Sequence, residues 1–352
     1  MEELNKGVGR RNVLLGIAGL GGTAALAACT GNSKGDSSSK KTTAATNANS
    51  AAGKTVTVGF SAPAADHGWI AAIQRNAENA AKQFSDVKLQ SVQPTNDIAA
   101  QIAAVETLIN KKVDVIVMLP NDGKQLTTVA RKAMDQGIPV INLDRVFDSP
   151  LAYRTWIGGD NYGMGVSAGN YIGEQLKQKG VSNPVIAEIA GIDSLPLTQQ
   201  RSQGFKDSLS KYGFKVGPRQ AAQFTVQSGQ SVTANLLQSA PHIDAIWNHD
   251  DDQGIGVLAA IKQANRKEFF MVGGAGSANA MREIKSGKSV LKATVLYPPT
   301  MASSAVALAR LIGQKKGLSD LTQPEVPASI TLYSATVTEA NVDQYLSLGF
   351  ES

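Results

Sequence analysis

The stretch VDVIVMLPNDGKQLTTVARKAMDQGIPVINLDR at residues 113–145 decides the fold of this chain. Residues 113–119 and 138–143 form two short apolar runs, and the helical segment between them, near residues 125–136, stops at Gly137. Strands that are apolar on both faces are typical of a parallel sheet covered by helices on both sides. The charged pair Asp144-Arg145 follows the second run directly. The stretch therefore predicts a strand–helix–strand unit with polar side chains where its second strand ends.

The same alternation extends in both directions from this unit. Further strands are predicted at residues 55–60, 87–92, 155–158, 185–190, 220–224, 245–248, 269–273, 291–295 and 330–333, with Val337 in a last short one. Apolar residues at helical spacing predict helices near residues 69–84, 98–109, 162–178, 199–210, 231–238, 254–264, 278–286 and 301–313. Two successive runs of such units, similar in size, predict an α/β chain with two doubly wound, Rossmann-like parallel-sheet domains.

Charged and aromatic side chains gather at the ends of these strands in both halves. In the first half, Asp66, His67 and Trp69 follow the strand at 55–60. In the second half, Phe224 ends one predicted strand, and Asp250 and Tyr297 follow others. Because doubly wound sheets bind ligands beyond the carboxyl ends of their strands, this placement predicts one cleft between two lobes.

The N-terminal residues predict an exported lipoprotein. Lys6 and the pair Arg10-Arg11 precede a weakly apolar run at 13–28, which is too short and too rich in glycine for a membrane span. The run ends in Leu26-Ala27-Ala28-Cys29, which resembles the lipobox of bacterial lipoproteins, and Cys29 is the only cysteine. We expect a signal peptide at 1–28 and lipidation of Cys29. The arginine pair leaves twin-arginine and general export both open.

Residues 29–54 are predicted to be the lipidated cysteine and a flexible tether, since residues 30–54 contain no large apolar side chain. Most of the formal net charge of +5 lies in residues 1–54, which leaves about +1 for residues 55–352. The folded part therefore lacks the concentrated basic face of a nucleic-acid-binding domain. A single cysteine also allows no internal disulfide, so the core alone must hold the fold.

Between residues 55 and 340 the chain resembles the ribose-binding-protein branch of the periplasmic binding proteins, with the type I fold. Four segments carry this resemblance, namely 137–145, Gly159-Asp160-Asn161, 201–205 and 249–256. The resemblance implies two lobes joined by a three-strand hinge, with crossings near Gly159, near 297–299 and near Ser329. We accordingly expect one lobe at 55–158 plus 298–328 and the other at 159–297 plus 329–352.

The resemblance also implies which residues hold a ligand. Asp144 and Arg145 match residues that hold sugar hydroxyls, Trp69 falls where a phenylalanine stacks, and Phe224 and Arg201 match an aromatic residue and an arginine of the second lobe. Other positions depart from the family. Gln199 stands in place of an arginine, Asp250 of an asparagine, Tyr297 of a glutamine, Leu119 of an asparagine and Ala275 of an aspartate. The candidate ligand-binding residues are Asp66, His67, Trp69, Asp144, Arg145, Gln199, Arg201, Phe224, Asp250 and Tyr297.

These residue types suit a sugar or sugar alcohol. Carboxylates accept hydrogen bonds from neighbouring hydroxyls, arginine supplies a rigid fork of donors, and aromatic rings cover apolar C–H faces. We further expect Asp144 to add little to the stability of the unliganded protein, because a binding aspartate in an open cleft is solvated.

The predicted function is the substrate-binding component of an ABC-type carbohydrate importer, a monomer that delivers a monosaccharide or sugar alcohol to permease and ATPase subunits. The alternative is a sensory receptor for a sugar-like signal on the same fold. A sugar-modifying enzyme fits least, because the sequence offers no nucleophile with its base and no convergent histidine or cysteine cluster. We expect no cofactor and no metal, since the three successive aspartates at 250–252 cannot all face one ion without strain.

Overall fold

The computed structural model describes residues 49–318 and 325–352. The predicted signal peptide, Cys29 and most of the predicted tether lie outside these residues. The described residues belong to one compact unit. None of their helices has both the length and the apolar character that crossing a membrane requires.

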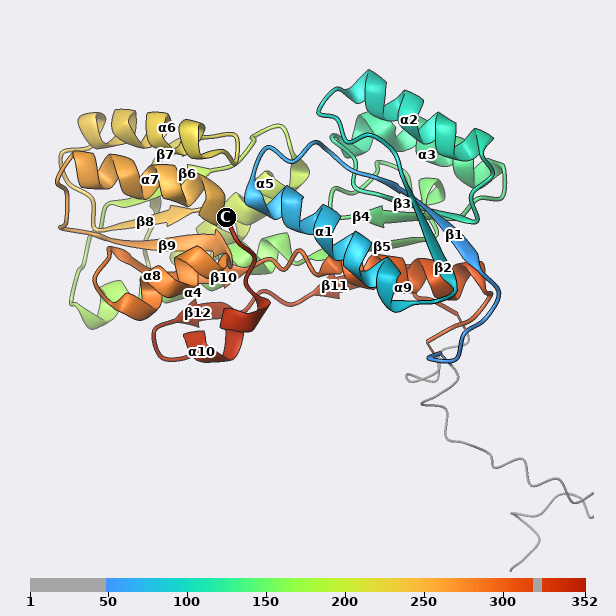
Figure 1. The fold of residues 1–352 in the computed structure, drawn as a ribbon. Helices are drawn as coiled ribbons and strands as arrows, with labels where there is room; N and C mark the ends of the chain where they lie inside the picture. Colours follow the sequence, from blue (N-terminus) through green and yellow to red (C-terminus); the bar gives the residue numbers. More distant parts are fainter. Residues whose placement is uncertain (1–48, 319–324) are drawn as a thin grey trace, which may run out of the picture. The chain divides into compact units, whose positions relative to one another are not determined.

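The first lobe is built on a parallel sheet in which the strand order is β11-β5-β4-β3-β1-β2 (Figure 1). Its strands are β1 (Val56–Ser61), β2 (Val87–Ser91), β3 (Val115–Met118), β4 (Val140–Leu143), β5 (Thr155–Gly159) and β11 (Ser329–Leu332). Its helices are α1 (Gly68–Gln83), α2 (Ile98–Asn110), α3 (Gly123–Asp135) and α9 (Met301–Gly313). Asp97 and Asp122 begin α2 and α3, and each carboxylate accepts a backbone N–H of the first turn.

Strand β3 shows why its residues are apolar on both faces. Val115 and Val117 join the core beneath α1 and α9, whereas Ile116 and Met118 join the core beneath α2 and α3. Side chains alternate between the two faces of a strand, so a strand covered by helices on both sides has to be apolar throughout. Figure 1 shows these two helix pairs on opposite faces of the sheet.

The second lobe repeats the plan, with the strand order β12-β10-β9-β8-β6-β7. Its strands are β6 (Ile186–Ala190), β7 (Val216–Ala221), β8 (Ala245–Asn248), β9 (Phe270–Ala275), β10 (Leu291–Leu296) and β12 (Thr336–Thr338), the last antiparallel to β10. Its helices are α4 (Asn161–Gln178), α5 (Pro196–Lys211), α6 (Val226–Ser239), α7 (Asp251–Gln263), α8 (Ala278–Ser286) and α10 (Val342–Tyr345). The predicted fold class, two doubly wound α/β domains, is confirmed.

Within the described residues the chain passes between the two sheets after Gly159, between Leu296 and Met301, and between Leu332 and Thr336. The last crossing differs from the one predicted near Ser329. Residues Ser329–Leu332 pair with β5 of the first sheet, so the lobe boundary lies after Leu332 and not before Ser329.

Three predicted elements of the second lobe are shifted. The strand expected at 220–224 is β7, which ends at Ala221, so Phe224 does not end a strand but lies in the loop after it. Helices α6 and α7 begin several residues before their expected starts, because Thr225 and Asp250 cap them. The two helix shifts arise where a side-chain cap, and not apolar periodicity, sets the boundary.

Candidate ligand-binding site

The carboxyl ends of the strands bring eight of the ten predicted residues around one small pocket. We call this volume, of about 30 Å³, the small pocket. The first lobe contributes His67, Trp69, Asp144 and Arg145, and the second contributes Leu197, Arg201, Phe224, Asp250, Ala275 and Tyr297. Both lobes therefore contribute polar and aromatic side chains to one place, as a ligand-binding cleft requires.

Three of these residues have a backbone conformation that non-glycine residues seldom adopt. Asp144, Phe224 and Ala275 have φ angles of 62°, 63° and 83°. Asp144 directly follows β4, and Ala275 is the last residue of β9. Such conformations cost on the order of 1–3 kcal/mol each and cluster at ligand sites. The two sheets thus carry backbone strain where their strands turn toward the pocket.

Tyr297 lines the small pocket and contacts residues of both lobes. Its hydroxyl donates to Asp144 Oδ1 at 2.5 Å and accepts from Asn161 Nδ2 at 3.1 Å. The Arg201 guanidinium carbon lies 4.6 Å from the centroid of its ring. Burial, with the charge of Asp144, raises the pKa of the Tyr297 hydroxyl far above its usual range. The phenol is therefore neutral, fully buried and satisfied as both donor and acceptor.

Asp144 was expected to be solvated, and this prediction is wrong. Its side chain is buried, with 5% of the residue exposed, because Tyr297 crosses from the second lobe to bind it. Its carbonyl oxygen also accepts a hydrogen bond from Trp156 Nε1 at 2.8 Å. Asp144 is thus held at the side chain by one aromatic residue and at the main chain by another.

The two arginines at the pocket, Arg201 and Arg145, differ in which of their guanidinium nitrogens have a hydrogen-bond partner. Arg201 donates from Nε to Asn161 Oδ1 at 2.9 Å and from a terminal nitrogen to the His249 carbonyl at 3.2 Å. Arg145 donates from a terminal nitrogen to the Asn121 carbonyl at 2.7 Å, but its buried Nε has no hydrogen-bond partner in the described part of the chain. Burial lowers the pKa of Arg145, and the negative charge of Asp144 partly offsets this lowering. Arg145 therefore retains a donor for a ligand.

Trp69 joins the lobes at the edge of the small pocket. Its backbone N–H donates to Asp252 Oδ2 at 2.9 Å, and its indole Nε1 donates to the Tyr297 carbonyl at 2.8 Å. Residue Trp69 lies in the first turn of α1, whose own preceding residue, His67, gives no side-chain cap. A carboxylate of the second lobe therefore caps a helix of the first lobe.

The three successive aspartates have three different partners. Asp250 caps α7, and Asp251 accepts backbone N–H groups of Gly274, Gly276 and Ser277 and the Thr294 hydroxyl. Asp252 accepts the Trp69 N–H of the other lobe. Burial, together with the charge of Asp252, raises the pKa of Asp250 to about 7. The carboxylates do not converge, and each has a structural partner.

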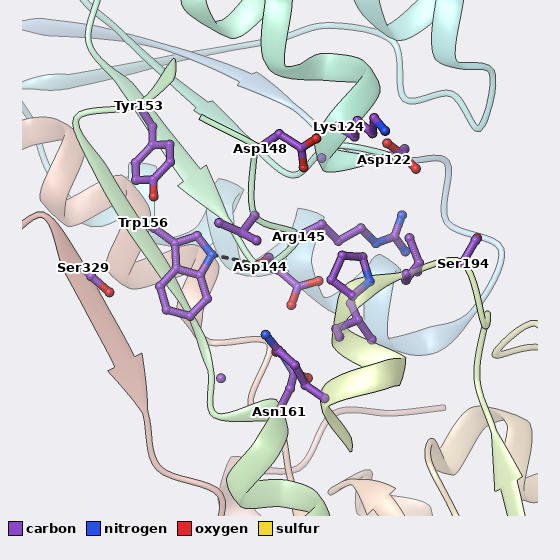
Figure 2. A pocket seen from close by; sticks show the side chains of 17 residues that line it. Asp122, Lys124, Asp144, Arg145, Asp148, Tyr153, Trp156, Asn161, Ser194 and Ser329 are labelled. Atoms are coloured by element: carbon purple, nitrogen blue, oxygen red, sulfur yellow. Dashed lines mark hydrogen bonds between the residues drawn. The ribbon is translucent and has the colours of Figure 1, made fainter. Parts of the chain in front are cut away.

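A larger cavity adjoins the small pocket on the side of β4 and β5 (Figure 2). This volume, which we call the large cavity, measures about 370 Å³ and also borders Asp144 and Arg145. Its other labelled residues are Asp122, Lys124, Asp148, Tyr153, Trp156, Asn161, Ser194 and Ser329. In Figure 2 the Trp156 indole lies beside Asp144, with its nitrogen bonded to that residue. Asp144 and Arg145 are thus the boundary between two unequal volumes.

Comparison with known proteins agrees with this arrangement. Residues 58–317 match the model of the periplasmic binding protein domain. The chain belongs to this family. The ribose import binding protein RbsB of Bacillus subtilis is 30% identical over 253 residues, which cover 72% of this chain and 80% of that protein. The galactofuranose-binding protein of Escherichia coli is 25% identical over 306 residues, which cover 84% and 93%.

Solved structures of periplasmic binding proteins share the fold. A Mycobacterium smegmatis protein in complex with β-D-fucofuranose is 26% identical, with a TM-score of 0.73, over 83% of this chain and 94% of that one. The fructose-binding periplasmic domain of a hybrid two-component system is 27% identical, with a TM-score of 0.73, over 83% and 93%. The family and these relatives are binding proteins and not enzymes.

Two predicted residues lie outside the small pocket of this periplasmic binding protein. Gln199 is exposed on α5, where its side chain donates to the Asp193 carbonyl at 3.2 Å. Leu197 and Arg201, four residues apart, share the helix face that lines the pocket, so Gln199 between them faces away. Asp66 lies beside the pocket and bonds His67 Nδ1 at 2.5 Å. Burial lowers the pKa of His67, but Asp66 and the charge of Asp250 outweigh it and raise the pKa.

The sequence prediction missed three residues at the site. Leu197 lines both volumes, but an apolar residue at the start of a helix carries no signal of its own. Asn161, which holds Tyr297 and Arg201 together, stood in a segment that resembled the family but was not taken as a candidate. Trp156 lies within β5, and only its neighbours Gly158 and Gly159 hint at a closely packed ring.

Proposed function

We propose that this chain is the substrate-binding component of an ABC-type carbohydrate importer, which captures a monosaccharide or sugar alcohol between its lobes and delivers it to a membrane permease. The observation that carries the proposal is the gathering of carboxylate, guanidinium and aromatic groups from both lobes around Asp144 and Arg145. Relatives named for the import of ribose or the binding of galactofuranose support the same class of ligand.

Enclosure between lobes fits the energetics of a small polar ligand. Binding at about 1 μM requires about −8 kcal/mol, or roughly −0.8 kcal/mol per atom for a ligand of about ten heavy atoms. A ligand this small reaches such an efficiency only when most of its surface is covered, which a closing pair of lobes achieves. Among the predicted contacts, Arg145 has an unused buried donor, and Asp144 is the acceptor shared by both volumes.

A thermal-shift screen tests the proposal. The panel comprises D-ribose, D-allose, D-galactose, D-fructose, L-arabinose, myo-inositol and glycerol. A ligand that binds only the folded protein raises the melting temperature, by mass action. We expect at least one sugar or sugar alcohol of the panel to do so. An unchanged melting temperature with every member of the panel would remove carbohydrate binding as the function.

The cellular placement is part of the proposal. The protein is exported, anchored by a lipid on Cys29, and works as a monomer with permease and ATPase subunits. The sequence Leu26-Ala27-Ala28-Cys29 supports the anchor. Cys29→Ser is expected to release the protein from membranes into the soluble fraction or the medium, as measured by fractionation. Continued membrane association and normal processing of the variant would exclude lipidation at Cys29.

A sensory receptor is the second candidate. The observation that favours it is the similarity to the fructose-binding periplasmic domain of a hybrid two-component system. Uptake of the best panel sugar, radiolabelled, distinguishes the two. A strain that lacks this protein loses high-affinity uptake if the protein serves an importer. The same strain keeps uptake but loses the transcriptional response to the sugar if the protein serves a receptor.

A further inference from the structure

We propose that Glu188, a buried residue of β6, is a positioning residue for Arg201, the arginine that the second lobe presents to the ligand. Glu188 acts through two neighbours, the Ser202 hydroxyl and the His249 imidazole. The inference rests on the proposed carbohydrate-binding function and deepens it, because it adds a residue that governs the affinity for the sugar without touching it.

Arg201 is the group that is positioned. It lines the small pocket, and its guanidinium carbon lies 4.6 Å from the centroid of the Tyr297 ring and 6.0 Å from that of Phe224. Its Nε donates to Asn161 Oδ1 at 2.9 Å, and one terminal nitrogen donates to the His249 carbonyl at 3.2 Å. Because the guanidinium is a rigid planar fork, holding two of its nitrogens sets the direction of the third. The aim of Arg201 therefore depends on where the His249 carbonyl lies.

Glu188 holds the residue that carries this carbonyl. Its Oε1 lies 2.9 Å from His249 Nε2, and the two side chains are 2% and 0% exposed. The imidazole also packs against the Trp247 ring, with the ring centroids 4.0 Å apart. The His249 side chain is thus fixed by a hydrogen bond and by an aromatic contact. The next residue, Asp250, lines the small pocket, so the same pair also steadies a second pocket residue.

Glu188 also holds the helix from which Arg201 extends. The Ser202 hydroxyl, on the next residue of α5, donates to Glu188 Oε1 at 2.5 Å. Successive residues of an α-helix point in directions about 100° apart, so a helix turned to place Ser202 on Glu188 has a defined direction for Arg201. One carboxylate therefore fixes both the helix that carries Arg201 and the carbonyl that its guanidinium binds.

The charges within this group support a fixed arrangement. Burial would raise the pKa of Glu188, but the bonds from His249 and Ser202 and the charge of Arg219 outweigh it and lower the pKa. Burial lowers the pKa of His249, although Glu188 opposes this lowering. Near pH 7 the glutamate is therefore ionised and the imidazole is neutral, with its proton on Nε2. His249 Nδ1 has no hydrogen-bond partner in the described part of the chain, as suits a ring nitrogen without a proton.

A second buried carboxylate, Asp86 of the first lobe, provides a comparison. It is 4% exposed, and its Oδ1 accepts from Arg310 Nε at 2.6 Å. Its other oxygen accepts the Gly53 N–H and the Gln314 amide. The linings of the small pocket and the large cavity are made of other described residues. Asp86 is therefore a buried acid with a structural role alone, whereas the partners of Glu188 lead to the ligand-binding cleft.

A double-mutant cycle tests the assignment, by calorimetric titration with the panel sugar that raises the melting temperature most. We expect Glu188→Gln to weaken binding about tenfold, because a neutral amide replaces the charged acceptor that Ser202 and His249 share. In an Arg201→Ala background the same substitution should change the affinity less than about twofold, since the group that it positions is absent. Asp86→Asn is the matched control, which should lower the melting temperature and leave the affinity unchanged.

Ser202→Ala provides a second test that does not depend on the folding of Glu188→Gln, because it removes one link from a half-buried position. It should weaken binding about threefold, and only when Arg201 is present. If Arg201→Ala binds too weakly for titration, Arg201→Lys, which lacks the planar fork, takes its place in both cycles. Circular dichroism and the melting temperature show that each variant is folded.

The outcomes separate the inference from the proposed function. Equal losses of affinity with and without Arg201 would mean that Glu188 acts on the stability of the lobe as a whole, and would overturn the inference alone. Unchanged affinity in both Glu188→Gln and Ser202→Ala would do the same. Failure of the natural protein to bind any panel sugar would overturn the proposed function itself and the inference with it.

Discussion

The two volumes beside Asp144 differ in what the fold has left unused. At the small pocket, the Tyr297 hydroxyl bonds Asp144 and Asn161, Arg201 also bonds Asn161, and little space remains. In the large cavity, the Asp148 carboxylate and the Tyr153 hydroxyl border open space and have no hydrogen-bond partner among the described residues. A cluster of polar and aromatic residues at strand ends is therefore not enough to locate a ligand.

The largest expected effect on stability comes from the carboxyl group of Asp250, which is buried at the edge of the small pocket. Burial and Asp252 raise the pKa of Asp250 from its ordinary value of about 4 to about 7. The folded protein thus keeps this proton to higher pH than the unfolded chain, so the carboxyl costs stability as the pH rises from about 4 to about 7. The full shift corresponds to an upper bound of about 4 kcal/mol.

Asp250→Asn removes this titration while keeping an oxygen that can cap α7. The variant should be more stable than the natural protein above pH 7, with the difference shrinking as the pH falls toward 4. Urea unfolding at several pH values measures the difference. Asp97→Asn, at the exposed cap of α2, is the matched control and should not show such a pH-dependent gain. A constant difference between Asp250→Asn and the natural protein would contradict a raised pKa.

The next largest effect on stability is expected at Gly159 and Gly158, against which the rings of Tyr297 and Trp156 pack. Gly159→Ala should destabilise the protein by about 1–3 kcal/mol, because the Tyr297 ring is buried and cannot move away from the new methyl group. Gly158→Ala should cost less, because Trp156 is half-buried and can shift into the large cavity. Chemical denaturation gives both values. Equal losses would mean that the two rings are equally confined, which would break the contrast between the two volumes.

These glycines show what the sequence could and could not predict. Apolar runs and helical spacing predicted both sheets, and the strand ends predicted that Asp144, Arg145 and Tyr297 would meet. That Tyr297 fills the pocket depends on its side-chain direction and on the space above Gly159. Such information is absent from a pattern of strands and helices, because packing decides it between residues far apart in the chain.

The predicted lobe boundary shows a similar limit. Strand β11 was assigned to the second lobe, yet it pairs with β5 of the first. Strand β11, residues 329–332, is short and only partly buried, and exposed and half-buried residues alternate along it. An edge strand of this kind carries little periodic signal, so its partner sheet can be identified only from its hydrogen bonds.

The smallest expected change in stability concerns the contact that joins the lobes beside the small pocket. Asp252→Ala removes the carboxylate that caps α1 from the other lobe and should cost about 1–2 kcal/mol. Because the bond crosses between lobes, the variant should also have a larger radius of gyration by X-ray scattering. Asp97→Ala removes a cap within one lobe and should lower stability without this expansion. Identical scattering from the two variants would mean that Asp252 does not hold the lobes together.

Asp144 borders both volumes, so its effect on sugar affinity tests the central claim, carbohydrate capture between the lobes, most directly. The measurement is calorimetric titration of Asp144→Ala and of the natural protein with the panel sugar that raises the melting temperature most. Loss of a hydrogen bond to a charged group costs about 1.5–3 kcal/mol, which predicts a roughly tenfold to more than hundredfold weaker affinity. A folded Asp144→Ala variant that binds this sugar as tightly as the natural protein would contradict the claim.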